Sequence, residues 1–370
     1  MGAKVLLFYE ICIVCVLYSA VVTGGASTEE LNCADMLYYN DLEEKVFEQP
    51  SALSVDCLTI VSGYVGIEPV KRLATLPDGV HATVIYGMYG SDNISAPLHK
   101  ALVELQEKLP NVEILYSTIP VHSKIYFWNE GDDIRSALIG SANFSVSGLR
   151  NDYKEVLSDV EESSFADFKA YYDYVRERSL PCTDESIKVR KVSKVSRTSI
   201  NHQPLLAKGI CRVSFLDRNG LVPKKSGLNW GCSGGHVKEG DAYIRITMDY
   251  VKTFPKMFPP KKYVDGIENI NSTGRKNREN DEVELIWDDG TVMTGLLEGQ
   301  SYNKIDGMVY PKQLSSSPKK SIMGEYLRKR LGVSMKHIIT KTDLRKYGRD
   351  SIDISLIGEG IYYMDFSVNK

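Results

Sequence analysis

The chain lacks the cysteine spacing that a zinc site or a disulfide framework would need. Its seven cysteines lie at positions 12, 15, 33, 57, 182, 211 and 232. Their number is odd, and only Cys12 and Cys15 have C-x-x-C spacing, within an apolar stretch that offers no second pair. We therefore expect reduced thiols, no metal site and no cofactor.

A strong excess of one charge is missing as well. The net charge of −3 argues against a uniformly basic protein that would bind nucleic acid over its whole surface. The two halves differ, however: residues 1–200 hold 18 Lys and Arg against 28 Asp and Glu, whereas residues 201–370 hold 27 against 20. Either this unevenness has no purpose, or the basic second half holds a polyanion. With 43% hydrophobic residues, a chain of 370 residues can bury two cores, and we expect two domains.

The most informative residues run from 121 to 144. In a strand predicted over Val121–Trp128, alternate side chains share a face, so His122 and Lys124 emerge side by side. An imidazole can attack phosphorus or transfer a proton, and an ammonium neutralises a non-bridging oxygen; neither role needs a metal. A second predicted strand, Arg135–Ile139, leads into a Gly-Ser-Ala-Asn turn at 140–143, whose small residues and donors suit an oxyanion.

At these positions the chain resembles the phospholipase D superfamily, whose signature is H-x-K, an Asp, then G-S and an Asn. The matching residues are His122, Lys124, Gly140, Ser141 and Asn143, with Glu155 matching a further Glu of the nuclease branch. The resemblance implies that His122 is the nucleophile, that Lys124 and Asn143 bind the phosphate, and that Glu155 orients a histidine. Ser141 completes the proposed catalytic set.

The sequence departs from this signature at the acid. Asn129 occupies the usual position of the Asp, and the gap to Gly140 is about four residues longer than usual. Asp132 and Asp133 are weaker candidates for the orienting acid. The motif occurs once, whereas the superfamily uses two histidines, so the resemblance implies a homodimer through the catalytic domain.

Residues 36–181 are predicted to form this α/β catalytic domain. Besides the two site strands, the apolar pattern predicts strands at 57–64, 82–86, 112–116 and 153–160, and helices at 68–76, 95–109 and 163–178. We expect a mostly parallel sheet with helices on its faces. Residues 182–209, which are rich in Lys and Arg, are interpreted as a linker, with contact to a DNA backbone as the alternative.

Residues 210–370 are predicted to be mainly β. Strands are expected at 242–248, 282–287, 291–297, 351–357 and 360–366, with hairpin turns at 288–290 and 358–360 and brief helices at 250–258 and 321–331. The run Tyr243-Ile-Arg-Ile, the segment 254–260 and Asp343-Leu carry a resemblance to the DNA-binding pseudobarrel of plant auxin-response-type transcription factors and certain restriction endonucleases.

Such barrels insert two loops as arms into the major groove. The first arm should be residues 224–231, and the second should run from Gln300 to Lys312. The candidate DNA-binding residues are Lys225, Asn229, Trp230, Gln300, Tyr302, Lys304 and Lys312. Asn and Gln can pair with adenine and Lys can read guanine, but each can also bind phosphate or remain solvated.

One long apolar run, residues 5–22, has a charge inside it at Glu10. It is either a signal peptide or marginal membrane span, or part of an upstream extension, because Met36-Leu-Tyr-Tyr resembles the natural start of phospholipase D-like restriction endonucleases. On either interpretation, residues 1–35 lie outside the fold.

Together these resemblances imply a cytoplasmic type II restriction enzyme that cuts double-stranded DNA at a specific sequence, without metal, through a phosphohistidine. A cognate DNA methyltransferase encoded nearby and no membrane association are expected. The alternatives are a secreted phospholipase D or nonspecific nuclease, and a non-catalytic DNA-binding protein. A metal-dependent carboxylate-lysine nuclease is disfavoured, because Asp152-Tyr153-Lys154 has no Pro-Asp suitably placed upstream.

Overall fold

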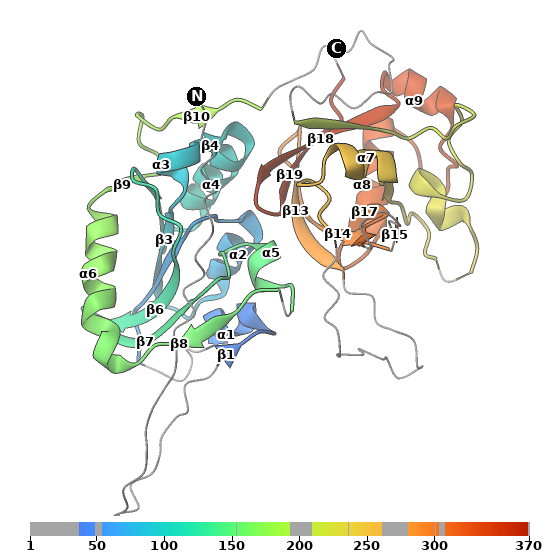
Figure 1. Ribbon diagram of the computed structural model, residues 1–370. Coiled ribbons are helices and arrows are strands. Elements are labelled where there is room, and N and C mark those ends of the chain that lie inside the picture. The colour runs from blue at the N-terminus through green and yellow to red at the C-terminus, as the bar shows by residue number, and fades with distance from the viewer. Residues whose placement is uncertain are drawn as a thin grey trace, which may run out of the picture. The chain divides into compact units, whose positions relative to one another are not determined.

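The computed structural model describes residues 37–48, 54–152, 154–192, 209–235, 237–260, 280–299, 301–302 and 308–368. All of them belong to one compact unit, Asp35–Lys370 (Figure 1). The predicted extension, residues 1–35, lies outside the described residues. Within the described part of the chain, no helix is long and apolar enough to cross a membrane.

The N-terminal domain is an eight-stranded sheet with helices on both faces. Its strands, together with a small pair formed by β4 and β10, are β1 (Leu37–Tyr38), β2 (Cys57–Ser62), β3 (His81–Tyr86), β4 (Ile94–Ser95), β5 (Val112–Ser117), β6 (Lys124–Glu130), β7 (Asp133–Gly140), β8 (Leu157–Asp159), β9 (Ser179–Pro181) and β10 (Val189–Arg190). Its helices are α1 (Leu42–Glu48), α2 (Ile67–Arg72), η2 (Leu73–Thr75), α3 (Tyr89–Asp92), α4 (Ala96–Lys108), α5 (Val146–Leu149), η3 (Glu162–Ser164) and α6 (Phe165–Arg176).

The strand order is β1-β8-β7-β6-β2-β3-β5-β9. Only the β2–β3 and β3–β5 pairs are parallel, so the prediction of a mostly parallel sheet is wrong. The reason is local: β6 and β7 are joined by Gly131 and Asp132 alone, and so short a connection can only link antiparallel neighbours. A parallel centre therefore carries antiparallel strands on both sides.

Two layers of helices bury the two faces of this sheet. Helix α4 places Leu98, Leu102 and Leu105 on one buried stripe, as its helical spacing predicts, and packs against α2. Helix α6 covers the opposite face through Val175 and its neighbours. Figure 1 shows α6 and α4 on opposite sides of the strands.

The first part of the predicted linker belongs to this domain. The backbone N–H of Cys182 donates to Ile114 at 2.9 Å, Cys182 itself is buried, and β10 pairs with β4. Residues 182–190 thus extend the fold of the N-terminal domain, and residues 193–208 lie outside the described ranges.

The C-terminal domain is built on a seven-stranded sheet in the order β11-β18-β19-β13-β14-β17-β12. Its elements, with the small β15–β16 hairpin, are β11 (Ile210–Ser214), η5 (Gly227–Cys232), β12 (Ile244–Arg245), α7 (Met248–Thr253), β13 (Asp281–Trp287), β14 (Val292–Glu298), β15 (Ser301–Tyr302), β16 (Val309–Tyr310), β17 (Gln313–Ser316), α8 (Ser321–Leu331), α9 (Lys341–Tyr347), β18 (Ser351–Gly358) and β19 (Ile361–Asp365).

The two predicted hairpins and the helix at 321–331 are confirmed. Of the strand predicted over 242–248, only Ile244–Arg245 forms a strand, and Met248 already begins α7. Helix α9 was not predicted.

The helices and the sheet of the C-terminal domain share one hydrophobic core. Its large buried side chains include Trp287, Phe258 and Phe366.

A second set of contacts attaches this sheet to the N-terminal domain. Ile286, Ile357 and Ile361 lie in the same buried cluster as the α2 and α4 side chains. Among them, the fully buried carboxylate of Glu284 accepts hydrogen bonds from the backbone N–H groups of Ile67 (2.8 Å) and Glu68 (3.1 Å) at the start of α2. A carboxylate at this place satisfies helix donors that have no partner inside the helix.

Burial raises the pKa of Glu284 from 4.5 to about 7, although its two backbone hydrogen bonds act in the opposite direction. Between these values the folded chain holds a proton that the unfolded chain has lost, so stability falls as pH rises. We expect the wild type to lose roughly 3 kcal/mol of unfolding free energy relative to Glu284→Gln between pH 4.5 and 8. Urea unfolding at several pH values measures this difference.

The exposed Glu325 on α8 provides the matched control. Glu325→Gln removes the same charge from the same domain without touching a buried group, so its stability should follow that of the wild type at every pH. A constant difference between wild type and Glu284→Gln across this range would contradict the prediction.

Candidate active site

The predicted pair of His122 and Lys124 does meet in space. His122 lies in the short segment before β6, which begins at Lys124, three residues later than predicted. The Lys124 ammonium nitrogen lies 3.0 Å from His122 Nδ1 and 3.2 Å from Nε2, and donates to the His122 carbonyl at 2.8 Å. His122 is exposed and Lys124 is buried, so the imidazole faces solvent above a fixed cation.

Gly63, at the end of β2, keeps this pair close to Asn143. A Cβ at position 63 would lie 3.2 Å from His122 Cδ2 and 3.3 Å from Asn143 Oδ1, tighter than ordinary contacts. The Gly63 N–H also donates to the Ser123 carbonyl at 3.1 Å. The absence of a side chain here lets His122 and Asn143 approach the same point from two sides.

The amide of Asn143 is buried and held on both of its polar atoms. Its oxygen accepts from the Tyr64 N–H at 3.1 Å and from the Ser62 hydroxyl at 3.4 Å. Its nitrogen donates to a carboxylate oxygen of Glu359, in the β18–β19 turn, at 2.5 Å. These partners fix which way the amide points, with its NH2 group directed toward the Glu359 carboxylate.

Gly140 and Ser141 hold the segment that carries Glu155. A Cβ on Gly140 would lie 2.0 Å from the Val156 carbonyl oxygen, so only glycine fits. The Ser141 N–H donates to that same oxygen at 2.9 Å, and its hydroxyl accepts from the Val156 N–H at 3.1 Å. Ser141 therefore ties the 154–156 segment to the end of β7, and Glu155 lies partly exposed beside it.

The weaker candidates for the orienting acid lie at the wrong end of the strand. Asn129 is close to the end of β6, and Asp132 and Asp133 lie at the turn into β7. With about 3.3 Å per strand residue, this turn is roughly 20 Å from the start of β6, where His122 lies. Neither aspartate can orient His122 within one chain.

Tyr64 and Asp92 are site residues that the sequence did not reveal. The Tyr64 ring meets the His122 ring edge-on, with centroids 6.2 Å apart and planes at 84°, and its hydroxyl donates to Asp92 at 3.0 Å. Burial and the Asp92 carboxylate raise the pKa of Tyr64 to about 12, so the hydroxyl keeps its proton at neutral pH. Only the position of Tyr64 two residues after a buried strand could have pointed to it.

Among the described residues, no group of three or more His, Cys, Asp or Glu side chains is arranged to hold a metal ion. The polar groups that the structure gathers around His122 are Lys124, Asn143 and Tyr64. This set can neutralise an oxyanion and present a nitrogen nucleophile.

Of the first predicted DNA-binding arm, Lys225 is exposed but Asn229 is fully buried. The Asn229 amide donates to the carbonyls of Pro223 (3.0 Å) and Ile339 (2.8 Å) and accepts from the Ile339 N–H (2.8 Å). The prediction that Asn229 reads a base is therefore corrected: its side chain is fully engaged in joining two loops of its own domain.

Trp230 is half-buried in the same arm. Its ring meets Tyr243 edge-on, and the Lys320 ammonium lies 4.7 Å from the ring centroid. Lys320 also forms an ion pair with Glu298 at 2.7 Å. Lys320 was not singled out in the sequence, and its contacts hold the first arm beside the end of β14.

The second arm is described only in part. Gln300 and Lys304 lie outside the described residues, and Tyr302 is placed by its backbone, which pairs with Val309 in the β15–β16 hairpin. Lys312 is exposed, and its N–H donates to the Glu298 carbonyl at 3.0 Å. Because Glu298 also binds Lys320, one network connects Lys312 to Trp230.

Comparison with known protein families assigns both domains. Residues 40–189 match the NgoFVII restriction endonuclease N-terminal PLD domain, and residues 206–358 match the NgoFVII C-terminal B3-like DNA-binding domain. The chain belongs to the NgoFVII restriction-endonuclease family. Its fold is thus a phospholipase D-like α/β domain followed by a B3-like, mainly-β DNA-binding domain, as predicted.

No curated protein matches the chain significantly. Among solved structures, NucT from Helicobacter pylori is 16% identical, covers 40% of this chain and 98% of its own, and gives a TM-score of 0.30. Nuc from Salmonella typhimurium, a phospholipase D family member, is 11% identical over 40% of this chain and 97% of its own, with a TM-score of 0.28. Phosphatidylserine synthase from Haemophilus influenzae is 18% identical over 37% and 35%, with a TM-score of 0.30.

The burial of Asn229 generates a prediction about stability. Asn229→Ala should lower the free energy of unfolding by roughly 2–4 kcal/mol, because it removes the partner of the buried N–H and carbonyl of Ile339 and of the partly buried carbonyl of Pro223. Urea unfolding of the full chain measures this loss.

Asn219→Ala is the control, since it deletes the same amide from an exposed turn of the same domain and should change stability by less than about 0.5 kcal/mol. If Asn229→Ala were as stable as the wild type and bound its DNA site more weakly, the base-reading role would be restored.

Proposed function

We propose that this protein is a type II restriction enzyme that cuts double-stranded DNA at a specific sequence through a phosphohistidine, without a metal ion. The observation that carries the proposal is the meeting of His122, Lys124 and Asn143 around Gly63. It joins a solvent-facing nucleophile to a buried cation and an oriented amide donor. The B3-like domain in the same chain supports DNA as the substrate.

In the proposed first step, a ring nitrogen of His122 attacks phosphorus, so a P–N bond forms as the P–O bond to the leaving deoxyribose breaks. Lys124 and Asn143 take up the charge on the non-bridging oxygens. The second chain's histidine protonates the leaving oxygen. It then removes a proton from water, whose oxygen attacks phosphorus and breaks the P–N bond, which restores both histidines.

This scheme needs two histidines, and one chain supplies one H-x-K motif. We therefore propose a homodimer through residues 36–181, with a shared site at its two-fold axis. Glu155 is proposed to orient a histidine there. The catalytic domain is acidic and has little positive charge with which to hold DNA. The second domain should therefore supply most of the affinity for DNA.

In that second domain, Lys225, Trp230 and Lys312 are proposed to contact DNA, together with Gln300, Tyr302 and Lys304 of the second arm. The exposure of Lys225 and Lys312 supports this assignment. Residues 193–209 are proposed as the linker, and residues 1–35 as a segment that folding does not need. A restriction enzyme acts on DNA inside the cell, so we propose a cytoplasmic protein with a protecting methyltransferase encoded nearby.

A secreted phospholipase D, or a nuclease without sequence preference, is the second candidate for the activity. It would share the same histidine chemistry, but it would make no use of a B3-like domain. Burying the charge of Lys124 costs free energy. A DNA-binding protein without activity would have no need of such a charge beneath an exposed imidazole.

His122→Ala should reduce DNA cutting by about 10³-fold or more, because it removes the nucleophile and the general acid together. Since His122 is exposed and lies outside the second domain, specific DNA binding should persist in a gel-shift competition. His81→Ala is the matched control, because it deletes an exposed histidine of the same domain, at the start of β3, and should cut normally.

Mixing the chains tests the shared site. Excess His122→Ala chain should reduce the DNA-cutting activity of the wild type by forming mixed dimers, whereas excess His81→Ala chain should leave that activity unchanged. A His122→Ala protein that still cuts, or that loses DNA binding, would refute the division of labour between the domains.

A second prediction concerns the mechanism. Plasmid cutting should continue in excess EDTA, and a DNA end joined to His122 through an acid-labile, base-stable P–N bond should be recoverable after rapid quenching. Loss of cutting under chelation, restored by Mg²⁺, would overturn the mechanism while leaving the assignment to a nuclease family intact.

A further inference from the structure

The turn between β18 and β19 contacts the catalytic domain at the side-chain nitrogen of Asn143. This hairpin tip consists of Gly358, Glu359 and Gly360 in the DNA-binding domain. Its Glu359 carboxylate accepts a hydrogen bond from Asn143 Nδ2 at 2.5 Å. In the reaction proposed above, this NH2 group is the donor for a non-bridging phosphate oxygen. The carboxylate oxygen therefore stands where a phosphate oxygen would stand.

The hairpin tip is held in place by backbone contacts as well. Ser147, on α5, donates its hydroxyl to the Glu359 carbonyl at 3.3 Å. Gly360 has a φ of +64°, and a Cβ on it would lie 2.4 Å from the Ser147 hydroxyl oxygen. The Gly360 carbonyl in turn accepts from the Glu284 N–H at 2.8 Å. Glu359 is thus placed by a tight turn seated on α5 and not by a free side chain.

The carboxylate also acts electrostatically on the site. Its charge, after burial and the nearer Asp92, is among the causes that raise the pKa of Tyr64, whose ring borders His122. A phosphodiester that approached Asn143 would meet the like charge of Glu359 at hydrogen-bonding distance and be repelled by it. Phosphate and the Glu359 carboxylate are thus two anions that compete for one NH2 group.

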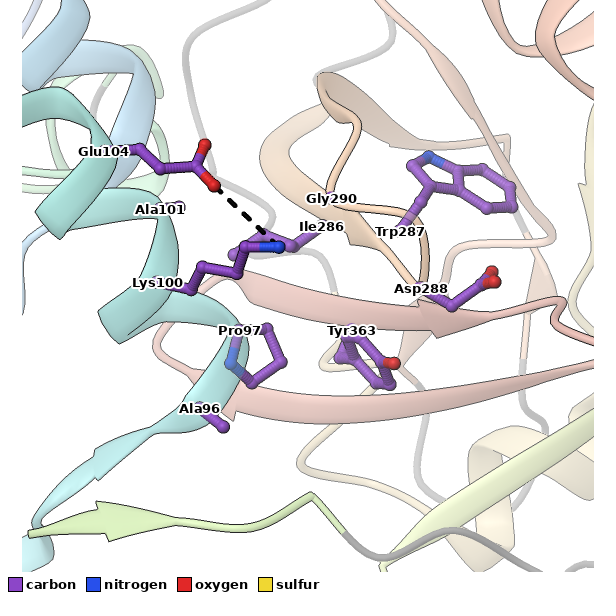
Figure 2. Close-up of a pocket in the computed structure, with 10 residues that line it drawn as sticks. All are labelled: Ala96, Pro97, Lys100, Ala101, Glu104, Ile286, Trp287, Asp288, Gly290 and Tyr363. Atoms are coloured by element: carbon purple, nitrogen blue, oxygen red, sulfur yellow. Dashed lines mark ion pairs between the residues drawn. The ribbon is translucent and has the colours of Figure 1, made fainter. Parts of the chain in front are cut away.

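The contact is nevertheless open to reversal. Glu359 is exposed, so solvent can reach its carboxylate. The seam between the two domains is not fully packed: a cavity of about 210 Å³ lies between α4 and the strands β13 and β19. Figure 2 shows Lys100 and Glu104 of α4 on one side of it and Ile286, Asp288 and Tyr363 on the other.

We propose that Glu359 is a built-in inhibitor of the phosphate site, which the DNA-binding domain inserts when no specific DNA is bound and withdraws when it is. This inference rests on the proposed nuclease function and names the regulation of the same site. Its consequence is that recognition and cutting are coupled: a phosphodiester reaches Asn143 only after the Glu359 carboxylate is withdrawn.

Three full-length variants test it. Glu359→Ala removes the charge and the acceptor, and Glu359→Gln removes the charge alone. Glu325→Ala removes an exposed carboxylate elsewhere on the same domain. The substrate is bis(p-nitrophenyl) phosphate, a small diester that carries no recognition sequence, so any effect on DNA affinity is absent. Cutting of DNA that contains the recognition site is measured in parallel.

We expect Glu359→Ala to raise kcat/KM for the small diester by about tenfold or more, with Glu359→Gln intermediate and Glu325→Ala at the wild-type value. Cutting at the recognition site should change by less than about threefold, because the wild type has already withdrawn the tip there. A fall in both activities would show that Glu359 merely positions Asn143, and equal rates for all chains would show that it has no role; either result overturns the proposal.

Inorganic phosphate provides a readout that does not depend on cutting. Glu359→Ala should bind phosphate about tenfold more tightly than the wild type, and Asn143→Ala should abolish the difference. Unchanged phosphate affinity in Glu359→Ala would overturn the inhibitor even if the wild type cuts DNA as proposed. Tighter phosphate binding in a chain that cuts no DNA would support the inhibitor and overturn the nuclease.

Discussion

The arrangement of the site depends on the hydrogen bonds made by the side-chain amide of Asn143. Its oxygen is tied to the end of β2 through Ser62 and Tyr64, and its nitrogen to the second domain through Glu359. Ser62 adds a bond of its own, since its hydroxyl accepts from the Phe144 N–H at 2.9 Å. A buried amide with both ends engaged cannot rotate without breaking a bond, so the loop after β7 has one position relative to His122.

The junction between the domains depends on a similar use of polar groups within an apolar surround. Glu284 completes the start of α2, and the Asn151 amide pairs with both the N–H (2.7 Å) and the carbonyl (3.2 Å) of Glu282. Hydrophobic contacts alone are tolerant of small slides, whereas these bonds are directional. They fix the position of β13 against α2 and α5. Because β19 pairs with β13, they also fix where the β18–β19 turn meets the N-terminal domain.

The sequence was informative where a local pattern decides the structure. The buried apolar run of β2, the leucine stripe of α4 and the H-x-K pair each follow from a pattern of a few residues, and the structure places the H-x-K pair beside Asn143. It was uninformative where the deciding contact is distant. Asn229 reads as a loop donor, and only the approach of Ile339, over a hundred residues later, buries it. Helix α9 was missed although Thr340 and Asp343 form a capping box that was visible as T-x-x-D. The role of Glu359 could not be read from a turn sequence, because its partner lies in another domain.

The glycine of the Gly-Ser pair at the end of β7 bears on how such motifs are interpreted. The Val156 carbonyl occupies the volume in which a side chain at position 140 would begin, so glycine is required there by the packing of two backbones, whether or not the chain performs chemistry. A relative that had lost its activity would still be obliged to keep this residue. Surveys that search for degenerate copies of the site would therefore learn little from the glycine and more from the pairing of an exposed His122 with the buried Lys124.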